Sequence, residues 1–108
     1  MTDQDGLVRA LLRDDAAGPH TLDSSVKKAY TAASLGVSTG VLTKIMVEHP
    51  DATGLRDMND KVLVLQGGLP IRAGGEVIGG IGVGATPGSD TDEACARAGL
   101  EKIADRLS

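Results

Sequence analysis

"EVIGGIGVGA", residues 76–85, reads as a β-strand, yet glycine recurs at Gly80, Gly82 and Gly84. Because side chains alternate between the two faces of a strand, one face here would carry almost none. Glycine inside a strand costs about 0.5–1 kcal/mol relative to alanine, so this repeated use needs a reason. We consider three explanations: a loop that binds phosphate, a surface that meets a ligand, or close packing against another element.

The phosphate explanation is disfavoured by the residues that follow the strand. Gly80, Gly82 and Ala85 fit the loose dinucleotide pattern G-x-G-x-x-A, which is a weak signal alone. The next helix would begin with acidic residues, which repel a pyrophosphate: Asp90, Asp92 and Glu93. The pattern also lacks a second parallel strand with its ribose-binding acid. Nucleotide binding is therefore not expected.

Close packing explains most of the glycines. "ACARAG", residues 94–99, lies in the predicted C-terminal helix and, like the strand, consists mostly of residues with small side chains or none. Small residues let two backbones approach closely, and a hairpin followed directly by a helix makes such a contact local. We therefore predict that residues 76–85 form the central strand of a sheet and pack against the C-terminal helix.

The other elements follow from hydrophobic periodicity and from turn and capping residues. Asp5 and Gly6 have the chemistry of a tight turn, although the strand before that turn is nearly absent. Thr21 is the expected cap of the first helix, and Ser38 or Thr39 begins the second. The pattern predicts strands over residues 7–13, 61–66, 69–72 and 76–85, and helices over about 21–35, 38–48 and 91–107. The expected fold class is α+β, an antiparallel β-sheet with helices packed against it.

Length and composition narrow the function classes. The 108 residues form one domain with a net charge of −4, and the single aromatic residue, Tyr30, leaves no surface for stacking bases. Nucleic acid is therefore not an expected partner. Cys95 cannot form an internal disulfide and is expected to be a buried thiol. Neither a signal peptide nor an apolar run of about 20 residues is present, which indicates a soluble cytoplasmic protein and no membrane partner.

The side chains that could bind iron are few: His20, His49, Met46, Met58, Tyr30 and Cys95. His20 is the better candidate because it lies in a Gly-Pro loop before a helix, although a simple helix-flanking role is an alternative. His49 is more simply a residue at the C-terminus of a helix. The chain lacks paired His or Cys residues at zinc spacing, so a structural zinc site is not expected.

Two further segments are candidates for a ligand pocket. Lys28 lies off the centre of the predicted apolar stripe and could hold a carboxylate at a pocket rim, or it could be a solvated helix lysine. "GGLP", Gly67 to Pro70, offers backbone N–H groups for a pocket wall, and simple turn geometry is the alternative. A nucleophile elbow and a catalytic triad are not recognisable, which favours a protein without catalytic activity.

Several of these segments resemble one known family. "KKAYTAASLG", "GGLPIRAGGEVIGGIGVGA" and "SDTDEACARAGL" are similar to the GlcG/HbpS family, also called haem-degrading or DUF336, which includes the C-terminal domain of PduO-type adenosyltransferases. The resemblance implies an antiparallel sheet packed with helices and assembly into dimers, tetramers or octamers. Several family members bind haem, and others accompany glycolate or propanediol metabolism.

The resemblance also indicates that the chain is short at its N-terminus. Family members usually have a long helix and a strand before the turn at Asp3 to Gly6. We therefore hypothesise that Met1 is a start site placed too late, or that the chain is truncated. In haem-binding relatives an axial histidine can lie on that preceding helix.

From this we expect one GlcG/HbpS-like domain over residues 1–108 that self-associates and binds a small ligand, haem or a related tetrapyrrole. The expected ligand-binding residues are His20, Lys28, Thr31, Gly67, Gly68 and Pro70, with His20 as the iron ligand. Two alternatives remain: an enzyme or accessory subunit in glycolate-type hydroxy-acid or haem metabolism, and a structural oligomerisation module.

Overall fold

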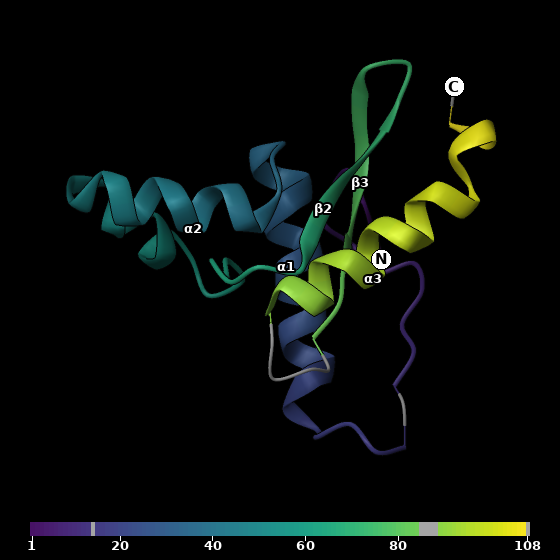
Figure 1. Ribbon diagram of the computed structural model, residues 1–108, viewed down its shortest axis with the longest axis horizontal. Helices are drawn as coiled ribbons and strands as arrows, with labels where there is room; N and C mark the ends of the chain where they lie inside the picture. Colours follow the sequence, from purple (N-terminus) through teal and green to yellow (C-terminus); the bar gives the residue numbers. More distant parts are fainter. Residues whose placement is uncertain (14, 85–88, 108) are drawn as a thin grey trace.

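The computed structural model describes residues 1–13, 15–84 and 89–107 of the chain (Figure 1). A three-stranded antiparallel sheet has the order β1-β3-β2 and consists of β1 (Thr2–Asp3), β2 (Gly68–Ala73) and β3 (Glu76–Gly82). The helices are α1 (His20–Leu35), α2 (Thr39–Glu48) and α3 (Ser89–Lys102), with the 3-10 helices η1 (Pro50–Asp57) and η2 (Ala104–Arg106). The predicted α+β class is confirmed, and β3 is the central strand as expected.

The bare face of β3 packs against α1, so the prediction that it meets the C-terminal helix is wrong. A Cβ atom on Gly80 would collide with the carbonyl oxygen of Ala29, and one on Gly82 with that of Ser25. α3 lies on the opposite face, where a Cβ on Gly99 would be 3.4 Å from Ile81 Cδ1. Figure 1 accordingly shows the strands between α1 and α3. The glycines therefore allow helix and sheet backbones to touch, but across a long sequence separation.

The interior is built mainly from small side chains. The buried apolar residues are Ala29, Ala32, Ala33, Leu42, Leu69, Ile71 and Ala96. Within α1, the buried face also includes Lys28 and Thr31, so Lys28 belongs to the buried face of the helix and does not lie beside it. The charge of Lys28 had indicated an exposed position, whereas the close approach of β3 brings this side of the helix into the interior.

The predicted strand over residues 7–13 is wrong. The turn itself forms, since the Gly6 N–H donates to the Asp3 carbonyl at 3.1 Å and Gly6 has a φ of 79°. However, β1 occupies the edge of β3 at Gly79 and Gly80. Residues 7–10 lie beside the other edge of β1, where the Arg9 N–H donates to the Met1 carbonyl at 2.9 Å, but they form only an isolated bridge between Thr2 and Val8.

The predicted strand over residues 61–66 is also wrong, because side chains take the backbone groups that a neighbouring strand would need. The Leu63 N–H donates to Thr31 Oγ1 at 2.8 Å. The N–H groups of Lys61 and Val62 donate to Asn59 Oδ1 at 2.8 and 3.0 Å. This apolar run therefore lies against α1 without joining the sheet.

Helix ends agree with the prediction more closely. α2 begins after Ser38, whose hydroxyl accepts the Val41 N–H at 3.1 Å. α1 begins at His20 after Pro19, so Thr21 is inside the helix and is not its cap. The predicted last helix is divided between α3 and η2. The side chains of Ser89 and Asp90 at its start lie outside the described residues, as does Ala85 of the expected strand.

Cys95 is exposed on α3, which corrects the prediction of a buried thiol. From residue 91 onward, the buried positions of this helix are Asp92 and Ala96, one helical turn apart, so the adjacent Cys95 points away from the interior. Among the described helices, none is long and apolar enough to cross a membrane.

Candidate functional site

The predicted site residues do not form one cluster but lie in three separate parts of the structure. Lys28, Thr31, Gly67 and Gly68 gather in the interior, where α1 meets the beginning of β2. His20 lies at the exposed start of α1. Pro70 is half-buried and lines a separate hollow of about 470 Å³ beside Leu100 of α3. Their shared role in ligand binding stays a prediction.

Lys28 forms the centre of the interior group. Its side chain is 2% exposed, so the expectation of an exposed lysine is wrong. The Nζ atom lies 3.2 Å from Asp92 Oδ2 and donates to the Val83 carbonyl at 2.9 Å. Lys28 thus connects α1, α3 and the end of the central strand through one ammonium group.

Gly67 and Gly68 make room for this connection. A Cβ on Gly67, whose φ is 133°, would lie 2.9 Å from Lys28 Nζ, and one on Gly68 would collide with the Lys28 carbonyl. The Gly68 N–H donates to Thr39 Oγ1 at 2.9 Å. These glycines are therefore at a packing junction between β2, α1 and α2.

Thr31 has no solvent exposure and uses its hydroxyl twice. It donates to the Lys27 carbonyl at 2.7 Å and accepts the Leu63 N–H at 2.8 Å. This threonine therefore attaches residues 61–66 to α1, a role that only the tertiary structure reveals.

His20 is close in sequence to a pocket. Ala17 and Thr21 both line that pocket, and His20 lies between them on the first turn of α1. Its imidazole lies over the backbone of Gly18, because a Cβ there would be 2.8 Å from His20 Cε1. Among the described residues, no group of three or more His, Cys, Asp or Glu side chains could hold a metal ion.

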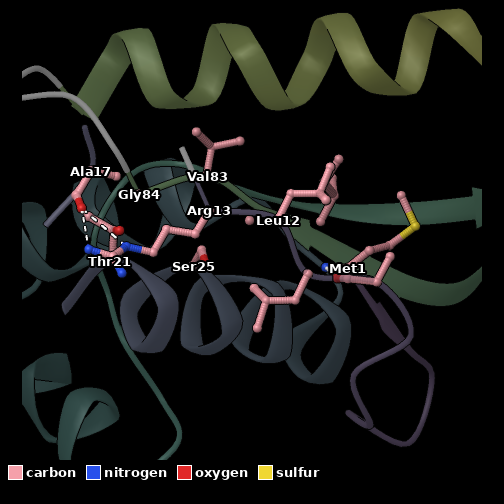
Figure 2. A pocket seen from close by; sticks show the side chains of 12 residues that line it. Met1, Leu12, Arg13, Ala17, Thr21, Ser25, Val83 and Gly84 are labelled. Atoms are coloured by element: carbon pink, nitrogen blue, oxygen red, sulfur yellow. Dashed lines mark hydrogen bonds between the residues drawn. The ribbon is translucent and has the colours of Figure 1, made fainter. Parts of the chain in front are cut away.

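The pocket itself has a volume of about 290 Å³ and lies at the edge of β3 (Figure 2). β1 pairs with Gly79 and Gly80, so the following part of β3 extends past the end of β1. Gly82 and Gly84 add no side chains there, which leaves a hollow. Its lining consists of Met1, Ala10, Leu11, Leu12, Arg13, Ala17, Thr21, Ser25, Ile81, Gly82, Val83 and Gly84.

The pocket is mainly apolar, and Arg13 lies at one end of it. Arg13 donates from Nε and Nη2 to the Ala17 carbonyl at 3.2 and 2.8 Å, which holds its guanidinium at the start of α1. Figure 2 shows Met1 toward the opposite end, with Leu12 and Val83 between them. Such an arrangement suits a flat apolar ligand that carries a carboxylate. The expected strand over residues 7–13 concealed this role of Arg13.

Asp3 positions the segment that covers the pocket. Its carboxylate accepts N–H groups from Leu7 at 3.1 Å and Asp5 at 2.9 Å, and the Nε of Arg9 at 2.9 Å. The Leu7 bond, followed by Arg9 and Asp5, lowers the pKa of Asp3 below its ordinary value. The ionised carboxylate thereby holds the turn from which residues 7–13 extend to the pocket.

Comparisons with known proteins place the chain in a family. The family described as "Haem degrading protein HbpS-like" matches residues 1–101. A double mutant of HbpS from Streptomyces reticuli is 40% identical, with a TM-score of 0.85 over 94% of this chain and 66% of that one. PduOC, solved as a complex with heme, is 26% identical with a TM-score of 0.85 over 94% of this chain and 74% of that one.

A curated relative is a 15.0 kDa protein from the dhaT-dhaS intergenic region of Citrobacter freundii. It is 34% identical over 84 residues, which are 77% of this chain and 59% of the relative. The chain thus spans about three fifths of that protein's length. The family match over nearly the whole chain and the close structural similarity to HbpS agree, and the chain therefore belongs to the haem-degrading HbpS-like family.

Proposed function

We propose that the protein binds haem or a related tetrapyrrole in the pocket at the edge of β3. The observation that carries this proposal is the apolar pocket with Arg13 at one end and His20 beside it in the chain. The HbpS-like family and the heme complex of PduOC support the choice of ligand.

The residues of the pocket suit the parts of such a ligand. Leu11, Ile81 and Val83 supply apolar surface for a ring system, and Arg13 supplies a cation for a propionate carboxylate. Haem iron takes an axial ligand such as imidazole, and His20 is exposed one residue before the pocket-lining Thr21. When bound, haem would supply the iron centre, and the chain would hold and orient it.

A titration with hemin tests this proposal. We expect the Soret band of the wild-type protein to shift and saturate, and His20→Ala to change the position of the bound band and to weaken binding about tenfold (about 1.4 kcal/mol). His49→Ala is the matched control, because His49 is also exposed but follows α2 outside the pocket lining. Saturation that is identical in all three proteins would contradict the role of His20, and no Soret shift would contradict haem binding.

Arg13→Gln tests the cationic end of the pocket separately. Since this variant keeps the iron ligand, we expect the same bound Soret position but weaker affinity for hemin. Affinity for a haem dimethyl ester, which lacks free carboxylates, should be unaffected by the substitution. An equal loss for both porphyrins would show that Arg13 acts only by shaping the pocket.

A second candidate is haem degradation, which the description of the family favours. If the bound haem is degraded, its Soret band decays after addition of ascorbate in air, faster than that of free hemin. A stable band under these conditions would leave binding as the function. We also propose self-association, because four large apolar side chains close together in the sequence are exposed: Leu7, Val8, Leu11 and Leu12.

A further inference from the structure

The wall of the pocket at Val83 and Gly84, which Figure 2 labels, is held from behind. β1 pairs with Gly79 and Gly80, so the next part of that edge of β3 borders the pocket and not a strand. On the side of β2, the Val83 N–H donates to the Gly67 carbonyl at 3.0 Å. The position of this wall therefore depends on the contacts that Val83 makes on the side away from the pocket.

Lys28 supplies the second of these contacts. Its Nζ atom donates to the Val83 carbonyl at 2.9 Å. A Cβ on Gly82, which lines the pocket, would be 3.0 Å from Lys28 Cβ, so the lysine lies directly behind the wall. Ser25 also lines the pocket and precedes Lys28 by three residues, which places both on the same side of α1. Lys28 itself is buried and is not part of the lining.

Packing alone does not explain a charge at this position. Replacing a buried ion pair by apolar side chains of similar volume is often neutral for stability or even stabilising. Two apolar residues in place of Lys28 and Asp92 could therefore hold α1 and α3 together. They could not donate a hydrogen bond to the Val83 carbonyl. Lys28 does so, and Asp92 Oδ2, 3.2 Å from Nζ, supplies the opposite charge that makes the burial of the ammonium group possible.

We propose that Lys28 is a positioning residue for the pocket: its ammonium group fixes the Val83 carbonyl, and with it the wall on which the ligand lies, while Asp92 balances the buried charge. The inference rests on the tetrapyrrole site proposed above. It adds that binding in the pocket depends on the docking of α3, because Asp92 belongs to this helix, of which no described residue lines the pocket.

The double variant Lys28→Met/Asp92→Leu separates positioning from stability. Because both charges are removed together, it should regain most of the urea midpoint that Lys28→Met alone loses. Its affinity for hemin, measured by Soret titration, should still be about tenfold lower than that of wild type. An effect of this size is typical when a group that orients a binding site from behind is lost. Wild-type affinity in the folded double variant would overturn the positioning role and leave the tetrapyrrole site intact.

Lys28→Gln/Asp92→Asn is a second variant that restores the missing donor. It is also neutral at both positions, but the glutamine amide can donate to the Val83 carbonyl. We therefore expect it to recover the hemin affinity that the Met/Leu pair loses. If the Met/Leu pair does not fold, a tenfold loss of affinity in a folded Gln/Asn variant would by itself overturn the role of the donor.

Leu42→Ala is the control for a general loss of stability. Leu42 is buried on α2 and does not line the pocket. Its truncation should lower the urea midpoint, because it leaves a cavity in the core, and should leave the affinity for hemin unchanged. An affinity that falls together with the midpoint in this variant would show that hemin binding reports stability alone, which would overturn the role of Lys28. No Soret shift in the wild-type protein would overturn the tetrapyrrole site and this inference with it.

Discussion

Lys28 and Asp92 bring two charges into an interior that consists mainly of alanine. Their side chains are 2% and 4% exposed, so each has lost nearly all contact with water. Such a pair adds little net stability relative to apolar residues, but either charge alone is expensive to bury. At the scale of single residues, this pair therefore matters because its two members depend on each other.

Lys28→Met should lower the free energy of unfolding by about 3–5 kcal/mol, because Asp92 would keep a buried charge without its ammonium partner. Urea denaturation of purified proteins measures the change. Lys27→Met is the control on the neighbouring residue, whose salt bridge is to an Asp23 side chain that is 72% exposed, and it should cost less than about 1 kcal/mol. Equal effects of the two substitutions would refute the role assigned to Lys28.

For the hydroxyl of Thr2 we predict the opposite effect: its removal should raise the free energy of unfolding. Among the described residues, this buried hydroxyl lacks a hydrogen-bond partner, whereas that of Thr39 accepts the Gly68 N–H. Thr2→Val should therefore raise the free energy of unfolding by about 1 kcal/mol, and Thr39→Val should lower it by about 1–3 kcal/mol. A loss of stability in Thr2→Val, measured in the same urea titrations, would show that its hydroxyl is bonded in solution.

At the scale of elements, the contact between β3 and α1 decides the fold. The glycines of β3 remove the side chains that would otherwise hold the helix away, so α1 lies directly on the strand backbone. The pocket is a consequence of the same feature, because the bare end of β3 continues past the short β1. One sequence feature thus produces both the tight core and the hollow beside it.

Gly82→Ala should destabilise the protein by at least about 2 kcal/mol, because the new methyl group meets the α1 backbone at Ser25 and at the Ala29 nitrogen, 2.7 Å away. Gly54→Ala is the control, since a Cβ on that residue of η1 meets nothing within 4 Å. It should leave stability unchanged or raise it by up to about 1 kcal/mol. A tolerated Gly82→Ala would show that α1 can move away from the strand.

Periodicity and capping residues were sufficient to predict α2, the β2–β3 hairpin and the central position of β3. The wrong predictions concern segments in which contacts between residues far apart in the sequence override the local pattern of apolar and polar residues. Residues 61–66 have the apolar run of a strand, but Asn59 and Thr31 bind their N–H groups. The glycine face was assigned to α3 because that helix follows next in the sequence, whereas α1 is the true neighbour.

The candidate site was less predictable than the fold. His20 could be selected because the sequence offers few possible iron ligands. The next residue in the sequence, Thr21, lines the pocket. Lys28 was expected either to hold a carboxylate at a pocket rim or to be solvated, whereas its side chain is buried against Asp92, a contact that depends on the tertiary fold. Arg13 was missed because its role depends on the Ala17 carbonyl, which the loop brings near through the tertiary fold.

At the scale of the whole molecule, a small core is combined with a large exposed apolar segment. Among the residues whose burial the structure describes, seven apolar ones are buried and four of these are alanine, so this part of the chain buries little apolar volume. Meanwhile, Leu7 and Leu12 leave most of their surface in water. A second copy that covers this segment would therefore contribute a substantial part of the stability of the folded protein.

If the proposed self-association produces a dimer that contributes in this way, the melting temperature should depend on protein concentration. Mass action stabilises a dimer by about 1.4 kcal/mol for each tenfold rise in concentration, which corresponds to an increase of about 3–5 °C for a protein of this size. Scanning calorimetry at protein concentrations that span two decades measures this slope. Leu7→Glu should abolish the dependence and give a lower melting temperature at high concentration, whereas Val47→Glu should retain the wild-type slope. A melting temperature that stays constant in the wild-type protein would mean that the core of one copy is sufficient and that the apolar segment remains uncovered in solution.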